Sequence, residues 1–103
     1  MSLVSDPFYR EWLDVELGHL GISHKSCANI TEILDALDTD PPEMVFADLS
    51  RHAHSLFALR ERGWFGPLFA IGEVSRNLCY ALGVTRVLSS PLSRAAFRDA
   101  VAA

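Results

Sequence analysis

The sequence predicts an α/β domain in which one parallel sheet of five strands carries helices on both faces. Two short runs, residues 44–47 and 68–71, are apolar at every position, which is typical of strands buried on both sides. Strand-like and helix-like segments alternate along the chain, and the gaps between strands are long enough for a helix. With 103 residues, 50% of them hydrophobic, we expect a single domain over residues 1–103.

The five expected strands differ in polarity. They cover residues 3–4, 22–27, 44–47, 68–71 and 84–88. The second contains Ile22 as its only large aliphatic residue, so we expect a weak strand at one edge of the sheet. The two continuous apolar runs are expected at its centre.

Capping residues and glycines indicate where the helices begin and end. The expected starts are Asp6 before Pro7, Asn29 with Glu32 three residues later, Ser75, and Ser90 or Ser93. Residues 50–55 are polar and fit either a loop or the first turn of a helix that stops at Gly63. Trp64 and Phe65 follow; we expect them to be buried under the next strand, and exposure would instead mark a contact site.

Charge is unevenly distributed, with a net value of −4. Residues 1–50 carry two basic against ten acidic side chains, whereas residues 51–103 carry seven arginines against three acidic residues. This asymmetry predicts an electrostatically biased partner surface but falls short of a nucleic-acid-binding composition. No apolar run approaches membrane-spanning length and no secretory signal opens the chain, so we expect a cytoplasmic protein without a membrane partner.

Several reactive residue types occur without the partners that their chemistry requires. Cys27 and Cys79 have no paired spacing, so reduced, buried thiols are expected rather than a disulfide or metal site. His52 and His54 are too few for a zinc site and are expected in a solvated loop, while His19 and His24 have no evident partners. The sequence contains no nucleophile elbow, glycine-rich phosphate loop or Cys-x-x-Cys motif, which argues against a serine hydrolase, a dinucleotide-binding domain and a thiol oxidoreductase.

Three stretches, in order, carry a resemblance to a known family. Residues 42–49 are an apolar strand ending in Asp48, residues 67–71 form a second such strand, and residues 81–92 contain a glycine, a strand and a Ser-Pro turn. Together they resemble the receiver domain of response regulators in two-component signalling. The resemblance implies a flavodoxin-like, doubly wound sheet with strand order 2-1-3-4-5.

The resemblance also implies a site at the carboxyl edge of the sheet. Asp48 takes the place of the phosphoacceptor aspartate and is also one of the expected magnesium positions. Asp6 takes the place of one member of the acidic pair that holds magnesium, and Ser5 takes the place of the other. The backbone carbonyl of Ser50 would be a further magnesium ligand.

Two further positions depart from the family pattern. The threonine or serine that follows the phosphoryl group is replaced by Gly72, and the lysine before the proline is replaced by Ser90. Phosphoryl transfer depends on positioning and charge neutralisation, so these changes and Ser5 remove much of the required chemistry. The resemblance therefore implies a degenerate pseudo-receiver that is not an enzyme and needs no cofactor, with magnesium required only if phosphorylation occurs.

Four arginines mark the expected partner face: Arg76, Arg86, Arg94 and Arg98. They fall on the expected fourth helix, fifth strand and fifth helix, where receivers commonly make dimer or partner contacts. Expected partners are a histidine kinase, an output domain or a second copy, and the domain could be part of a larger signalling protein. Two alternatives remain: a functional receiver phosphorylated on Asp48, and a sensor that binds an anionic ligand such as a nucleotide on the arginine face.

Overall fold

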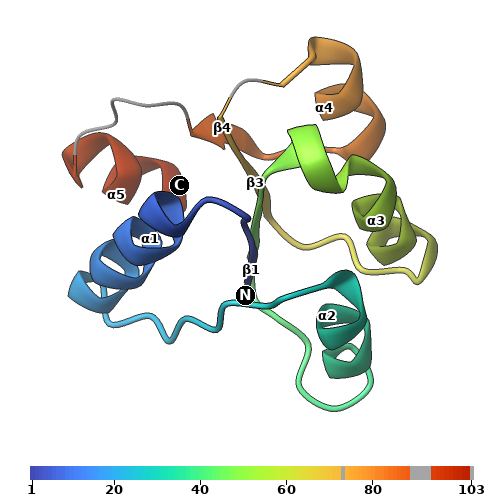
Figure 1. The fold of residues 1–103 in the computed structure, drawn as a ribbon, viewed down its shortest axis with the longest axis horizontal. Helices are drawn as coiled ribbons and strands as arrows, with labels where there is room; N and C mark the ends of the chain where they lie inside the picture. The colour runs from blue at the N-terminus through green and yellow to red at the C-terminus, as the bar shows by residue number, and fades with distance from the viewer. Residues whose placement is uncertain (73, 89–93, 103) are drawn as a thin grey trace.

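A computed structural model of the chain describes residues 1–72, 74–88 and 94–102. Four parallel strands form its sheet in the order β1-β2-β3-β4 (Figure 1). They are β1 Ser2–Leu3, β2 Val45–Ala47, β3 Leu68–Ile71 and β4 Arg86–Leu88. Leu3 pairs with Ala47, Ala47 with Ala70, and Ala70 with Val87, so the carboxyl ends of neighbouring strands meet at one edge.

The prediction of five strands is wrong by one strand. Instead of an edge strand at 22–27, the described structure has a single parallel bridge between Ser26 and Ser2. The Ser2 N–H donates to the Lys25 carbonyl at 3.0 Å, and the Cys27 N–H donates to the Ser2 carbonyl at 2.8 Å. Polar residues 23–26 supply little apolar surface to extend this pairing. The segment still lies beside β1, so the doubly wound order is confirmed.

Five helices cover the two faces of the sheet in the described structure. They are α1 Pro7–His19, α2 Ile30–Ala36, α3 Leu49–Glu61, α4 Arg76–Leu82 and α5 Arg94–Ala102. Figure 1 shows α1 and α5 on one side of the sheet and α2, α3 and α4 on the other. None of the described helices is both long and apolar enough to cross a membrane.

Two apolar clusters, one on each side of the sheet, form the core. On the α1–α5 side, Phe46 and Phe69 pack with Leu13, Leu17 and Phe97. On the other side, side chains of α2, α3 and α4 pack against β2 and β3. The helices contribute Ile33, Leu56, Leu59 and Leu82, and the strands contribute Val45, Ala47, Leu68 and Ala70. Every β2 and β3 residue is buried, as continuous apolar runs predict.

Three predicted N-caps are confirmed. Oxygen atoms of the Asp6, Asn29 and Ser75 side chains accept from backbone N–H groups two or three residues later, at 2.9–3.3 Å. Gly83 ends α4 with a left-handed φ of 66°, a conformation that glycine adopts without strain. The loop alternative for residues 50–55 is wrong, because α3 begins at Leu49, directly after Asp48.

The two aromatics before β3 differ from each other. The indole N–H of Trp64 donates to the Pro42 carbonyl at 3.1 Å, and the ring packs on the core. Phe65 is 77% exposed, so its predicted burial is wrong.

Both cysteines are free, but Cys79 is only half-buried, whereas Cys27 is buried. Burial raises the pKa of the Cys27 thiol, which favours its neutral form.

Candidate functional site

Asp48 lies at the carboxyl edge of the sheet, between β2 and α3. Its N–H donates to the Leu3 carbonyl at 3.1 Å, and its own carbonyl accepts from the His52 N–H at 3.0 Å. These two bonds fix Asp48 to the end of β1 and to the first turn of α3. The residue is half-buried and lies at the sheet edge where doubly wound proteins place the crevice that holds their sites.

The loop after β1 brings Ser5 and Asp6 to the same edge. Oδ1 of Asp6 accepts from the Phe8 N–H at 2.9 Å and thereby caps α1. Oγ of Ser5 lies 3.1 Å from Nε2 of His52, at hydrogen-bonding distance. The β1 loop and the start of α3 are therefore joined by a direct side-chain contact at this edge of the sheet.

His52 is a site residue that sequence reasoning missed. The prediction of a solvated loop for His52 and His54 is wrong, since both lie in α3. His52 is four residues after Asp48, a spacing that puts two helical residues on one side of the axis. If residues 49–52 had been predicted as helical, this spacing would have indicated that His52 lies near Asp48.

Gly72 follows β3 at the same edge, as predicted. Its φ of 88° lies in the region that side-chain-bearing residues rarely adopt, and its N–H donates to the Leu88 carbonyl at 3.0 Å. A Cβ there would meet no atom within 4 Å, so the constraint against threonine or serine comes from the backbone rather than from space. Ser50 lies in the first turn of α3, and Ser90 lies outside the described residues.

Two of the positions that the resemblance assigns to a magnesium site already make other contacts. Mg²⁺ requires octahedral oxygen ligands at close to 2.1 Å, usually including carboxylates. At this edge Ser5 is engaged by His52, and Oδ1 of Asp6 is engaged by the helix cap. Ser50 is already helical, and helical carbonyls point along the axis toward the C-terminal end. Within residues 1–72, 74–88 and 94–102, no three His, Cys, Asp or Glu side chains are grouped to hold a metal.

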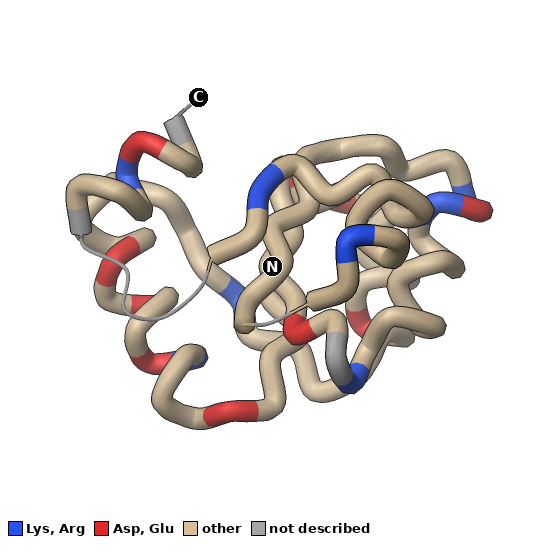
Figure 2. The backbone as a smooth tube through the Cα atoms, turned by 90° about the horizontal axis from the view of Figure 1, so that it is seen from above, with Lys and Arg blue, Asp and Glu red and all other residues tan. Residues whose placement is uncertain are grey.

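The four arginines of the predicted partner face lie on three elements. Arg76 begins α4, Arg86 begins β4 and Arg98 lies in α5; all three are exposed. Arg94 begins α5, and its side chain is outside the description. Figure 2 shows the Lys and Arg positions spread along the described backbone rather than gathered on one face. A broad basic surface of the kind that binds nucleic acids is not formed by the described residues.

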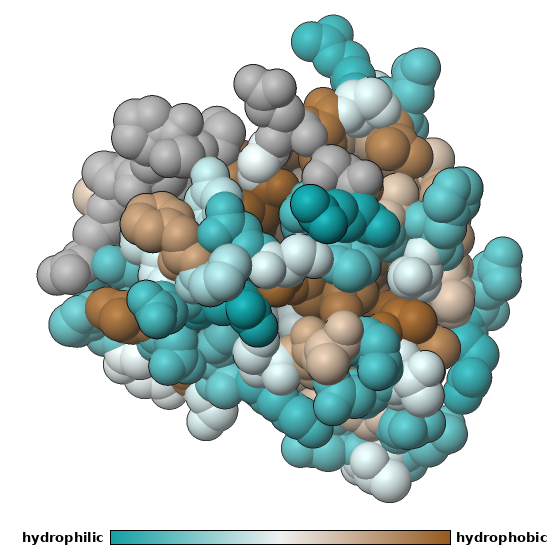
Figure 3. Space-filling view, viewed as in Figure 1, coloured by the Kyte–Doolittle hydropathy of each residue, from teal (hydrophilic) through white to brown (hydrophobic). Residues whose placement is uncertain are grey.

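A groove between α4 and β4 adds apolar surface beside Arg76. It has a volume of about 440 Å³ and is lined by Val74, Arg76, Cys79, Tyr80, Val84 and Val87. Tyr80 is 82% exposed and Val87 is 45% exposed. Sequence reasoning missed Tyr80, although its position off the apolar stripe of α4 indicates exposure. On the face shown in Figure 3, the apolar side chains lie in small separate areas.

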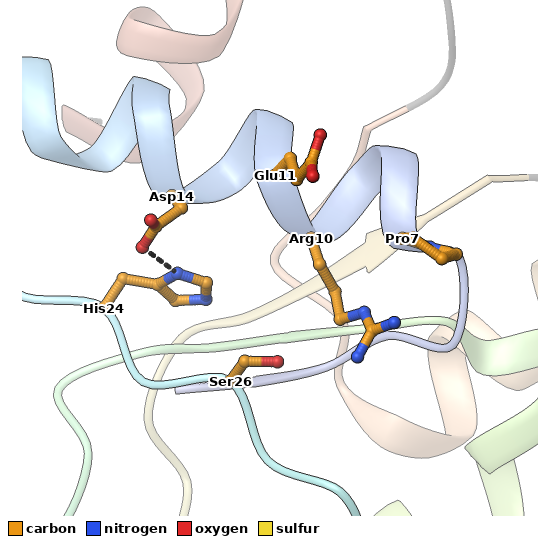
Figure 4. Close-up of a pocket in the computed structure, with 6 residues that line it drawn as sticks. All are labelled: Pro7, Arg10, Glu11, Asp14, His24 and Ser26. Carbon is orange, nitrogen blue, oxygen red and sulfur yellow. Dashed lines mark hydrogen bonds and ion pairs between the residues drawn. The ribbon is translucent and has the colours of Figure 1, made fainter.

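His24 has two partners, so the expectation that it lacks them is wrong. Its Nε2 lies 2.8 Å from Oγ of Ser2, and its Nδ1 lies 3.1 Å from Oδ1 of Asp14 in α1. Figure 4 shows Asp14 and His24 facing each other across a groove of about 330 Å³ that Arg10 and Ser26 also line. A serine, histidine and carboxylate in this order resemble a nucleophilic triad. Ser2 is completely buried, however, so we assign these two hydrogen bonds a structural role. They hold residues 22–27 on β1.

Comparisons with known proteins bear on the fold. No protein-family model matches the sequence, and no curated protein sequence matches it significantly. The structure is similar to the chemotaxis protein CheY4 of Vibrio cholerae, at 17% identity and a TM-score of 0.80, over 98% of this chain and 93% of that one. It is also similar to a response regulator receiver protein from Burkholderia phymatum, at 21% identity and a TM-score of 0.75, over 97% and 90% of the two chains.

A third similar structure comes from a larger protein. The C-terminus of RcsC from E. coli, which contains a linker region and a phosphoreceiver domain, matches at 20% identity and a TM-score of 0.76. The match covers 99% of this chain and 44% of that one. At identities this low, the structural similarity establishes the fold but not the chemistry of the site. The chain therefore has the fold of a response-regulator receiver domain, as the three sequence stretches predicted.

Proposed function

We propose that this chain is a receiver-like signalling domain that acts through protein contacts and is not phosphorylated in the usual way. The observation that carries the proposal is the hydrogen bond between Ser5 and His52 at the crevice. It engages a side chain where a receiver would place a carboxylate for its cation. The positive φ of Gly72 disfavours a hydroxyl-bearing side chain at the next strand end.

The proposed chemistry follows from the charges at this edge. An aspartyl phosphate at Asp48 would add negative charge beside the Asp6 carboxylate, and its formation would require cations to neutralise it. With Ser5 in place of an acid and Ser90 in place of a lysine, the chain supplies neither the second member of the family's acidic pair nor the usual ammonium group. We propose that the domain has no catalytic turnover and uses no cofactor.

The proposed contact surface is the groove between α4 and β4. Its exposed Tyr80 and flanking Arg76 are residue types that dominate binding energy at protein interfaces. Val74, Val84 and Val87 supply apolar surface for a partner side chain, and Arg76 adds positive charge at the first residue of α4. A histidine kinase, an output domain or a second copy of the chain, presenting an acidic and apolar surface, would complement this groove.

Site-specific crosslinking in the native host tests this surface. A photoreactive phenylalanine analogue at Tyr80 is expected to give a discrete crosslinked product, whereas the same analogue at the exposed Phe65 is not. With the captured partner purified, Tyr80→Ala is expected to raise its Kd at least tenfold, because exposed interface tyrosines commonly act as anchors. Crosslinking from Phe65 alone, or an unchanged Kd for Tyr80→Ala, would argue that the contact lies elsewhere.

A further inference from the structure

His52 forms the contact that spans the crevice. Its ring nitrogen Nε2 and the Ser5 hydroxyl are 3.1 Å apart and come from residues 47 positions apart in the chain. His52 is the fourth residue of α3, and its backbone N–H is bonded to the Asp48 carbonyl. The ring is therefore carried by a helical turn whose position is fixed directly to the end of β2.

The ring contacts Ser5, one of the positions from which a receiver would hold a cation. Ser5 and Asp6 follow β1, Asp48 follows the adjacent β2, and the two strands are paired in register up to Leu3 and Ala47. A divalent ion at this edge would have to collect oxygen ligands from both strand ends. The hydrogen bond to His52 instead connects the β1 loop to the helix after β2.

We propose that His52 is a specificity-determining residue that excludes divalent cations from the crevice by holding the side chain at position 5. The proposal rests on the proposed function and extends it. The loss of a carboxylate at position 5 is then one of two changes that disfavour a cation, and His52 is the other. A carboxylate restored at that position would accept a hydrogen bond from the His52 ring. The ring N–H would thus compete with Mg²⁺ for the oxygens that the ion requires.

Magnesium chloride titrations of three variants test this role. Each purified protein is labelled with ¹⁵N, and its backbone amide shifts are followed by NMR. Ser5→Asp alone is expected to bind Mg²⁺ at least tenfold more weakly than the double variant Ser5→Asp with His52→Ala. The matched control combines Ser5→Asp with His54→Ala, which removes an exposed histidine two positions later in the same helix. This control is expected to behave like Ser5→Asp.

A second readout monitors the hydrogen bond itself. The ¹⁵N signal of His52 Nε2 is expected to move in Ser5→Ala relative to the unmodified chain, whereas the ring signals of His54 are not. Equal Mg²⁺ affinity of Ser5→Asp and the double variant, including the absence of binding in both, would overturn the role of His52. Magnesium-dependent phosphorylation of Asp48 in the unmodified chain would instead overturn the proposed function, so the two failures are distinguishable.

Discussion

Replacing Phe46 with alanine is expected to lower the free energy of unfolding by about 3–5 kcal/mol, as for other fully buried phenylalanines. Phe46 lies in the middle of β2 with none of its surface exposed. Its ring stacks on Phe69 at a centroid distance of 4.9 Å and lies 6.0 Å from Phe97 of α5. Phe97 in turn makes an edge contact with Trp12 of α1 at 4.8 Å. The substitution would leave a cavity between the sheet and both helices of that layer.

Urea denaturation followed by circular dichroism measures this loss. Phe8→Ala is the matched control, because Phe8 is 65% exposed and its truncation is expected to change stability by no more than about 0.5 kcal/mol. A similar loss for both variants would mean that the aromatic cluster does not hold the layer together. Phe46 precedes Asp48 by two residues, so the same packing also orders the strand end at the crevice.

Replacing Arg60 with alanine is expected to cost about 2–4 kcal/mol, since several hydrogen bonds from a charged donor are lost at once. Nε donates to the Leu82 carbonyl at 2.7 Å, and Nη2 donates to the Gly83 carbonyl at 3.1 Å. Nη1 donates to the carbonyls of Trp64 and Gly66 at 3.1 and 3.0 Å. The guanidinium also lies 5.2 Å from the centre of the Trp64 ring. One side chain thus joins α3, the following loop and the end of α4.

Arg62 provides the control for Arg60. Its guanidinium makes an exposed ion pair with Asp38 at 3.6 Å, so Arg62→Ala is expected to cost less than about 0.5 kcal/mol in the same urea experiment. Arg60→Lys is expected to recover less than half of the loss, because one ammonium cannot reproduce the planar fork. Burial lowers the pKa of Arg60, but an arginine remains charged across the accessible pH range. Equal stability of Arg60→Ala and Arg62→Ala would contradict this account.

Features set by local sequence were predicted well. The runs around Phe46 and Phe69 are apolar at every position, and burial on both faces is the environment that accommodates such a run. Asp6, Asn29 and Ser75 act within three residues of their own positions, so their caps could be identified without knowing the fold. The order of these elements then determined the doubly wound topology.

Contacts between distant residues could not be predicted in the same way. His24 is separated from Ser2 by 22 positions and His52 from Ser5 by 47, and neither pair has a sequence pattern of its own. The polar segment at 22–27 is predicted as a weak edge strand because such strands can be short and polar, but its residues form only one bridge. Arg60 was not identified either, because its partners are backbone carbonyls, which every residue provides.

We propose that the fold of a receiver is used here without phosphorylation of Asp48. The direct test is intact-protein mass spectrometry after incubation with acetyl phosphate and magnesium chloride, with Asp48→Asn as the control. We predict that the unmodified chain keeps its mass, as the control does, since Ser5 and Ser90 stand where receivers carry an acid and a lysine and the Ser5 hydroxyl is engaged by His52. Stoichiometric addition of a phosphoryl group that hydroxylamine removes, and that Asp48→Asn abolishes, would contradict the claim.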